Sequence, residues 1–210
     1  MKGYFISFEG GDGCGKSTQI SLFEDYCRSR GYDVVSTREP GGTPISEKIR
    51  SILLDADNSE MSPVTEALLY AASRAQHVEE KIRPAVESGK IVVCDRFLDS
   101  SIAYQGYARG LGDGVRVINE FAVEGTLPDL TFFLKLDPET GMKRVENGRG
   151  EKDRLELEAM DFHKKVYDGY IALCKLYKGR IIPIDAGRTI EEVAEDIRKA
   201  FDEYIAERTQ

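Results

Sequence analysis

A glycine-rich stretch near the start of the chain holds the residues best suited to chemistry. From Gly10 to Ser17 it fits the pattern G-x-x-x-x-G-K-[ST] at every fixed position. Glycines let successive backbone N–H groups turn toward phosphate oxygens, and a helix that begins near Lys16 adds the positive end of its dipole. The Lys16 amino group suits terminal phosphates, and the Ser17 hydroxyl suits Mg²⁺. The pattern therefore predicts a loop that holds a nucleotide through Gly10, Gly11, Asp12, Gly13, Cys14, Gly15, Lys16, Ser17 and Thr18.

The flanking sequence favours this interpretation over a chance glycine-rich turn. An apolar run at 4–8 precedes the stretch, and an amphipathic run at 19–30 follows it. Strand, loop and helix in this order are the context that the pattern requires.

Apolar and amphipathic runs alternate along the rest of the chain, which is typical of an α/β fold. We expect strands at 4–8, 33–37, 91–95, 130–136 and 181–184. We expect helices at 19–30, 46–54, 63–81, 115–123 and 155–177, one that starts at 138, and one after the capping box of Thr189 and Glu192. The prediction is a phosphate-loop NTPase fold, in which helices flank a central parallel sheet of five strands.

Single residues refine these expectations. Pro183 predicts an edge or irregular position for the last strand, because proline cannot donate a ladder hydrogen bond. Pro84 should break or kink the helix at 63–81. Asp113 is a candidate cap for the helix at 115–123. Ser100, Ser101, Tyr104 and Gln105 are expected to be polar loop residues, and 146–154 a loop rich in glycine and charge.

Length and charge limit the possible functions. The chain has 210 residues, which suits one domain over 1–210, and a net charge of −8, which argues against nucleic acid as a partner. Four scattered cysteines form no C-x-x-C pair, and two histidines offer no zinc spacing. We expect a cytoplasmic protein with no membrane partner.

An acidic residue ends the apolar strand at 91–95, and an arginine follows it directly. Asp95 closes that strand, where a carboxylate can hold Mg²⁺ opposite Ser17. The other interpretation is an aspartate that caps a helix or forms a salt bridge. Arg96 follows, and its guanidinium can bind phosphate bidentately or pair with Asp95.

Two further sets of residues could contact a substrate. Tyr70 and Arg74 are four apart on one helix and share a face, which suits a flat base, although a core tyrosine and a solvated arginine are the simpler interpretation. Glu39 lies in a turn after the second strand, where α/β sheets bind ligands, or it is a surface acid. Arg149, Lys152 and Arg154 form either a solvated charge run or a lid that closes on a transferring phosphoryl group.

Together these features favour a small-molecule kinase. The sequence has no N-K-x-D motif of a GTPase and no LSGGQ motif of a transporter ATPase. It has several arginines near the loop and no obvious base to activate water. An acceptor that is itself a phosphate would need positioning and charge neutralisation rather than a strong base.

Several segments together resemble the thymidylate kinase family, which phosphorylates dTMP with ATP. These segments are the stretch from Phe8 to Thr18, T-R-E-P-G-G-T at 37–43, L-Y-A-A-S-R at 69–74, C-D-R-F at 94–97, D-S-S-I-A-Y-Q-G at 99–106 and P-D-L-T at 128–131. The resemblance covers nearly the whole chain.

The resemblance implies roles for the matching residues. Tyr70 would stack on thymine, a position where many relatives carry Phe; Arg74 would bond to the base, and Ser101 and Gln105 would contact it or its surroundings. Arg50 and Arg96 would bind the dTMP phosphate, Glu39 and its neighbour Pro40 would lie close to the acceptor and to Mg²⁺, and Asp12 would face the nucleotide sugar. Tyr104 would crowd the 2′ position and favour deoxyribose.

One position separates two types within the family. Eukaryotic-like members carry an arginine in the phosphate loop where this chain has Gly13. The chain therefore resembles the bacterial type, in which a lid arginine is catalytic, here Arg149 or Arg154. The family also implies a cytoplasmic homodimer that binds dTMP and Mg·ATP. A kinase for another nucleotide or nucleoside and a non-catalytic nucleotide-binding regulator remain the alternatives.

Overall fold

A central parallel sheet organises the computed structural model of the protein, which describes residues 3–148 and 153–209. Its strands are β1 (Tyr4–Glu9), β2 (Val34–Arg38), β3 (Ile91–Asp95), β4 (Leu130–Lys135) and β5 (Ile181–Asp185), arranged in the order β2-β3-β1-β4-β5. The fold prediction is confirmed, as is the edge position of the strand that carries Pro183.

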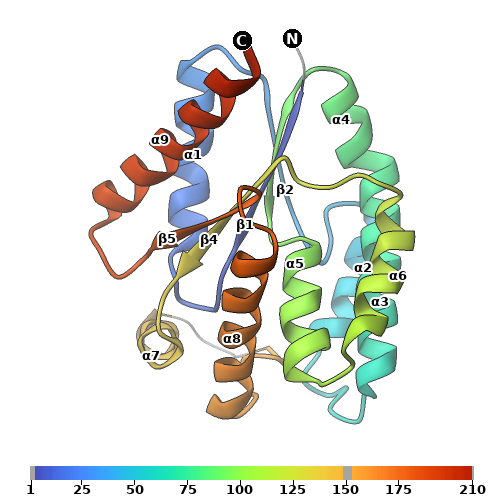
Figure 1. Ribbon diagram of the computed structural model, residues 1–210. Helices are drawn as coiled ribbons and strands as arrows, with labels where there is room; N and C mark the ends of the chain where they lie inside the picture. The colour runs from blue at the N-terminus through green and yellow to red at the C-terminus, as the bar shows by residue number, and fades with distance from the viewer. Residues whose placement is uncertain (1–2, 149–152, 210) are drawn as a thin grey trace.

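Helices cover both faces of the sheet (Figure 1). The α-helices are α1 (Lys16–Ser29), α2 (Pro44–Leu54), α3 (Pro63–His77), α4 (Arg83–Glu87), α5 (Leu98–Ser101), α6 (Asp113–Val123), α7 (Pro138–Gly148), α8 (Met160–Leu176) and α9 (Ile190–Thr209). Two π-helical segments, η1 (Val78–Ile82) and η2 (Ile102–Ala108), continue α3 and α5. No helix among the described residues combines the length and apolar character needed to cross a membrane.

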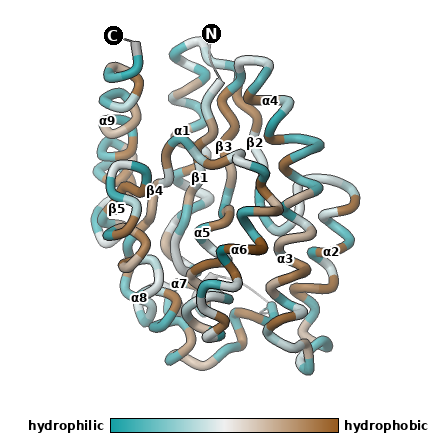
Figure 2. Tube along the Cα trace, turned by 45° about the vertical axis from the view of Figure 1, so that its right-hand side comes forward, coloured by the Kyte–Doolittle hydropathy of each residue, from teal (hydrophilic) through white to brown (hydrophobic). Residues whose placement is uncertain are grey.

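The strands divide the core in two because their side chains alternate between the faces. Ile6 and Phe8 of β1 pack with α1 and α9, whereas Phe5 packs on the face of α5, η2 and α8. Figure 2 shows apolar segments running through the strands between these layers. Glu9 therefore lies on the same face as Phe5, with α5 and α8.

Some local expectations were wrong. Residues 98–108 form α5 and η2 rather than a loop, because their polar side chains turn inward to the site. Gly112 is the N-cap of α6, and the Asp113 carboxylate instead accepts a hydrogen bond from Arg116 Nε at 2.8 Å. Helix α7 continues to Gly148, into the segment expected to be a loop, and α8 begins only at Met160. The helical path from Pro63 continues to Glu87, but the π-helical η1 interrupts its α-helical hydrogen bonding, and Pro84 lies in the first turn of α4.

An aromatic cluster between α1, α9 and the sheet offers a test of the core. Phe23 is 2% exposed, and its ring centre lies 5.1 Å from Phe201 and 5.8 Å from Phe132. We predict that Phe23→Ala lowers the free energy of unfolding by about 3–5 kcal/mol in urea denaturation, because it leaves a cavity. The control Leu176→Ala removes a side chain that is 69% exposed and should cost less than about 0.5 kcal/mol. Equal losses in both variants would contradict this packing.

Candidate active site

The glycine-rich loop joins β1 to α1 and curls around the side chain of Lys16. The Lys16 amino group donates hydrogen bonds to the carbonyl oxygens of Gly10 at 3.1 Å and Gly11 at 3.2 Å. The lysine is 9% exposed, so its charge is held inside the loop by neutral partners. A phosphate oxygen would be a stronger partner than either carbonyl, because it carries charge.

Gly13 lies against the start of α7 in this loop. Its φ is +72°, and a Cβ there would overlap the carbonyl oxygen of Gly141. A Cβ on Gly141 would in turn overlap the carbonyl oxygen of Asp12. No side chain, and hence no arginine, fits at position 13 with this backbone.

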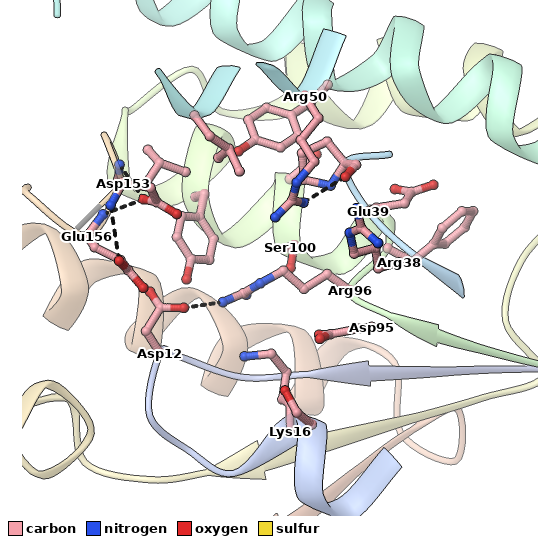
Figure 3. A pocket seen from close by; sticks show the side chains of 18 of the residues that line it. Asp12, Lys16, Arg38, Glu39, Arg50, Asp95, Arg96, Ser100, Asp153 and Glu156 are labelled. Carbon is pink, nitrogen blue, oxygen red and sulfur yellow. Dashed lines mark hydrogen bonds and ion pairs between the residues drawn. The ribbon is translucent and has the colours of Figure 1, made fainter. Parts of the chain in front are cut away.

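A cavity of about 430 Å³ opens beside the loop (Figure 3). Most of the predicted site residues line it: Asp12, Gly13, Cys14, Gly15, Lys16, Ser17, Thr18, Glu39, Pro40, Arg50, Tyr70, Arg74, Asp95, Arg96, Ser101, Tyr104 and Gln105. Arg38, Leu54, Phe97, Ser100, Asp153, Leu155 and Glu156, which were not among the predicted site residues, line it as well. The fold thus joins the loop and the residues after β2 and β3 in one space.

Arg96 crosses from the end of β3 to the loop. Its Nη2 pairs with Asp12 Oδ1 at 2.7 Å, its Nη1 donates to the Gly10 carbonyl at 2.9 Å, and its guanidinium lies over the Tyr104 ring at 5.2 Å. The ion pair is therefore with Asp12 rather than with Asp95. Burial alone would raise the pKa of Asp12, but the charges of Arg96 and Lys16 hold it below its ordinary value.

Asp95 has the features of a metal ligand. Its Oδ1 is buried and has no hydrogen-bond partner among the described residues, although Asp95 lines the cavity. Ser17 is exposed and lines the same cavity. A carboxylate and a hydroxyl beside bound phosphates are the kind of oxygen set that Mg²⁺ takes, so these two residues fit the ion.

Arg74 is wholly enclosed, so the expectation of a solvated arginine was wrong. It is 1% exposed, its Nε donates to Glu39 Oε2 at 2.7 Å, and its Nη1 donates to Ser101 Oγ at 3.0 Å. Nη1 also bonds to Asn119 Oδ1, and Nη2 donates to the Phe97 carbonyl at 3.1 Å. Arg74 thus fixes the back of the cavity, while Tyr70, four residues earlier, lines it.

Glu39 is 4% exposed and is not a surface acid. Its second oxygen, Oε1, accepts from Nδ1 of the buried His77 at 3.0 Å, and His77 Nε2 lies 2.7 Å from Thr37 Oγ1. A Cβ on Gly42 would lie 2.5 Å from His77 Nε2, so this contact explains a glycine of the T-R-E-P-G-G motif. Sequence reasoning missed His77, although it lies three residues after Arg74 on the same helix face.

Glu9 is a second buried acid that sequence reasoning left without a role. Its Oε1 accepts from the Phe97 backbone N–H at 2.8 Å, and its Oε2 accepts from Ser100 Oγ at 2.6 Å and the Tyr170 hydroxyl at 2.8 Å. Burial, with the nearby charge of Asp99, raises the pKa of Glu9 to about 7. The only sequence signal was an acid at the end of the first strand, directly before the loop.

Positive charge collects at the opposite wall. Arg50 Nη1 donates to the Pro40 carbonyl at 2.8 Å, and Arg38 lines the same cavity. Burial and the charge of Arg38 lower the pKa of Arg50, which indicates that this wall favours an added anion. The chain is acidic as a whole, and the described lining of its cavity has five basic and five acidic side chains.

Of the two arginines predicted as catalytic lid residues, the structure describes only Arg154. Arg149 and Lys152 lie outside the described residues. Arg154 is 7% exposed; its Nε donates to the Leu53 carbonyl at 2.9 Å, and its Nη1 pairs with Glu66 Oε2 at 2.7 Å. Arg154 does not line the cavity, so in this arrangement it holds the chain to α2 and α3.

Comparison with known proteins accounts for this combination of loop and cavity. Residues 8–197 match the family model described as thymidylate kinase. The chain belongs to the thymidylate kinase family. It is 56% identical over 206 residues to a thymidylate kinase of Thermoanaerobacter sp. (strain X514), covering 98% of this chain and all of that one. It is 51% identical to a thymidylate kinase of Clostridium novyi (strain NT), with 94% and 97% covered. The crystal structure of thymidylate kinase from Ehrlichia chaffeensis is similar with a TM-score of 0.79 and 32% identity, over 96% of this chain and all of that chain.

The carboxyl group of Glu9 gives this thymidylate kinase family member a testable pH dependence. Its pKa rises from 4.5 to about 7 on folding, so its contribution to stability is fully present below about pH 4.5 and is lost as the pH rises through about 7. Glu9→Gln stays neutral, and the hydroxyls of Ser100 and Tyr170 can accept from its amide. We predict that Glu9→Gln gains stability relative to the parent from pH 5 to pH 8, by at most about 3 kcal/mol. Thermal unfolding of both proteins across this range measures the difference; a constant difference would contradict the raised pKa.

Proposed function

We propose that this chain transfers the γ-phosphoryl group of ATP to dTMP, giving dTDP and ADP. The observation that carries the proposal is the single cavity of about 430 Å³ that joins the phosphate loop to the buried Tyr70–Arg74 face. A loop for a phosphate chain and a pocket for a flat base, in one space, suit a nucleotide donor and a nucleotide acceptor. Membership in the thymidylate kinase family identifies the acceptor as dTMP.

The acceptor needs no general base. An oxygen of the dTMP phosphate is already ionised; it bonds to the γ-phosphorus as the bond to the β–γ bridging oxygen breaks, and ADP leaves with those electrons. The work of the protein is to position the reactants and to neutralise charge. Lys16 lies at the donor phosphates, and Arg96 lies between the loop and Tyr104, where it can contact the transferring group.

Asp95 and Ser17 would hold the Mg²⁺ ion that accompanies ATP. The buried Oδ1 of Asp95, which has no hydrogen-bond partner in the part of the chain that the structure describes, supports this assignment. When bound, the ion neutralises charge on the phosphates. Asp95 and Ser17 would supply oxygen ligands beside the loop, and Lys16 would bind the phosphates.

The acceptor nucleotide would occupy the rest of the cavity. Tyr70 would stack on thymine, Arg74 would bond to the base, and Ser101 and Gln105 would contact it or its surroundings. Arg50 would bind the dTMP phosphate together with Arg96, beside Pro40 and Glu39, and Asp12 would face the sugar. Tyr104 is 5% exposed under Arg96, which supports its proposed role of excluding a 2′-hydroxyl.

The proposal also covers the domain bounds, the lid and the cellular compartment. We assign 1–210 to one nucleoside monophosphate kinase domain, with a lid at about 146–154 that excludes water when it closes. The contacts of Arg154 with Glu66 and Leu53 favour Arg149 as the catalytic lid arginine. A reducing cytoplasm suits the four free cysteines, three of which are buried.

The chain is also proposed to form a homodimer through α3 and α6, which lie side by side (Figures 1 and 2). Val64 and Leu68 on α3 are 56% and 51% exposed, and Val117 and Phe121 on α6 are 55% and 83% exposed. Each pair is four residues apart and therefore shares a helix face. An apolar surface of this kind marks a protein interface, and a second copy of the chain is the partner that the family implies.

Lys16 provides the test of catalysis. We predict that Lys16→Ala loses at least about 100-fold in kcat for dTMP at saturating ATP, because the phosphates lose their mobile positive charge. Coupled ADP release measures the rate, and thermal unfolding confirms the fold. Lys175→Ala, which removes an exposed lysine of α8, should leave kcat unchanged. The panel includes dUMP, dCMP, AMP and thymidine; turnover of one of these in preference to dTMP would refute the assignment, and activity in Lys16→Ala would refute the mechanism.

Phe121 provides the test of the dimer. Sedimentation velocity should give the parent chain twice its mass of 23.5 kDa. We predict that Phe121→Asp shifts the protein to monomer, because the interface would bury an unpaired charge. Leu176→Asp changes an equally apolar side chain that is 69% exposed on α8 and should remain dimeric. A monomeric parent chain would contradict the homodimer.

A further inference from the structure

Glu66 lies directly behind one of the residues that face the cavity. Gln105 lines the cavity and is 1% exposed, and its amide nitrogen Nε2 donates to Glu66 Oε1 at 2.8 Å. Glu66 is 0% exposed and is not among the residues that line the cavity. It therefore acts on the cavity through Gln105.

Three basic contacts keep Glu66 ionised. Arg109 donates through Nε at 3.3 Å and Nη2 at 3.1 Å, and Arg154 Nη1 lies 2.7 Å from Oε2. Burial alone would raise the pKa of Glu66, but the hydrogen bonds from Arg109 and Gln105 hold it below its ordinary value. An ionised carboxylate only accepts hydrogen bonds. The amide of Gln105 can consequently turn only its NH₂ group toward Glu66, and its carbonyl oxygen Oε1 points away.

Thymine and cytosine differ at the edge that such an amide reads. Thymine presents an N3–H donor beside carbonyl oxygens, whereas cytosine presents an N3 acceptor beside an amino group. A fixed carbonyl accepts from the N3–H of thymine and meets a lone pair at N3 of cytosine. An amide free to rotate by half a turn would match either base.

Arg74 does not read the N3 position. Its guanidinium nitrogens also donate to Glu39, Ser101, Asn119 and the Phe97 carbonyl. A guanidinium is a donor only, so it can favour the O4 carbonyl of thymine over the amino group of cytosine, but it cannot accept from the N3–H of thymine. Reading N3 requires an acceptor, and the amide of Gln105 has both an acceptor and a donor.

We propose that Glu66 is a positioning residue that locks the amide of Gln105 in the orientation that accepts thymine and rejects cytosine. This inference rests on the proposed function, in which the base of the acceptor lies against Gln105. Glu66 itself touches no substrate. Its effect is on the selectivity among acceptors, whereas a residue needed only for folding would change all acceptors alike.

The test compares dTMP with 5-methyl-dCMP, which keeps the methyl group of thymine but has the cytosine edge. Glu66→Gln can donate as well as accept, so it releases the amide of Gln105. We expect the ratio of kcat/KM for dTMP to that for 5-methyl-dCMP to fall at least about 10-fold, with the change mainly in KM. Steady-state rates with both acceptors at saturating ATP give the ratio.

Arg109→Gln is the matched control. It removes an ion pair from the same carboxylate but leaves Glu66 as an acceptor, so its ratio should stay within about threefold of the parent value. Should Glu66→Gln not fold, the double variant Glu66→Gln/Arg109→Gln, which removes the buried charge with one of its two arginine partners, carries the same test.

The outcomes separate the inference from the function on which it rests. A parent chain that phosphorylates dTMP, with an unchanged ratio in Glu66→Gln or an equal fall in Arg109→Gln, overturns the inference alone. A parent chain that does not phosphorylate dTMP overturns the proposed function and the inference with it. A fall confined to the variants that lack the Glu66 carboxylate supports both.

Discussion

The parallel pairing of β1 with β3 is the constraint on which the site depends. Phe8 pairs with Asp95 in that register, and the backbone N–H of Arg96 donates to the Phe8 carbonyl at 2.9 Å. Backbone contacts alone therefore bring Asp95 and Arg96 next to the phosphate loop. Pairing of β2 with β3 then brings Glu39 to the same edge, since its N–H donates to the Asp95 carbonyl at 2.9 Å. Three chain segments that are remote in sequence meet because parallel strands end together.

Buried carboxylates connect the side chains in and behind the wall of the cavity. Glu9, Glu39 and Glu66 are each less than 5% exposed, and each is surrounded by donors from elements distant in sequence. Burying a charge costs free energy unless it is paired and hydrogen-bonded, so these acids specify one arrangement of their neighbours rather than adding much net stability. A cavity for two polyanions needs such order, because its arginines would otherwise repel one another when no substrate is bound.

Local patterns predicted much of the fold and of the site. The strands appear where apolar runs end in polar residues, and the loop, Asp95 and Arg96 line one cavity, as their positions in the sequence indicated. Tyr70 and Arg74 line it too, but the family resemblance rather than their spacing pointed to that. The networks behind them were not predictable, because Glu66, Gln105 and Arg109 meet across about 40 residues of sequence, and no periodicity records such a contact. The prediction of loop residues in what is α5 and η2 was wrong for a related reason. Their polar side chains have buried partners, and a sequence shows that a residue is polar but not which partner it has.

The contact of Gly13 with Gly141 makes two positions far apart in the sequence behave as one site under mutation. Each lacks a side chain because the backbone of the other segment fills that space. A methyl group at either position would push the phosphate loop away from α7. A second methyl group would then enter space that is already open, so the losses of folding stability in the two single variants should not add in the double variant. An arginine at position 13 of this chain would therefore require the start of the helix that carries Gly141 to move. Among the described side chains, α7 contributes none to the main cavity, yet its packing limits what position 13 can carry.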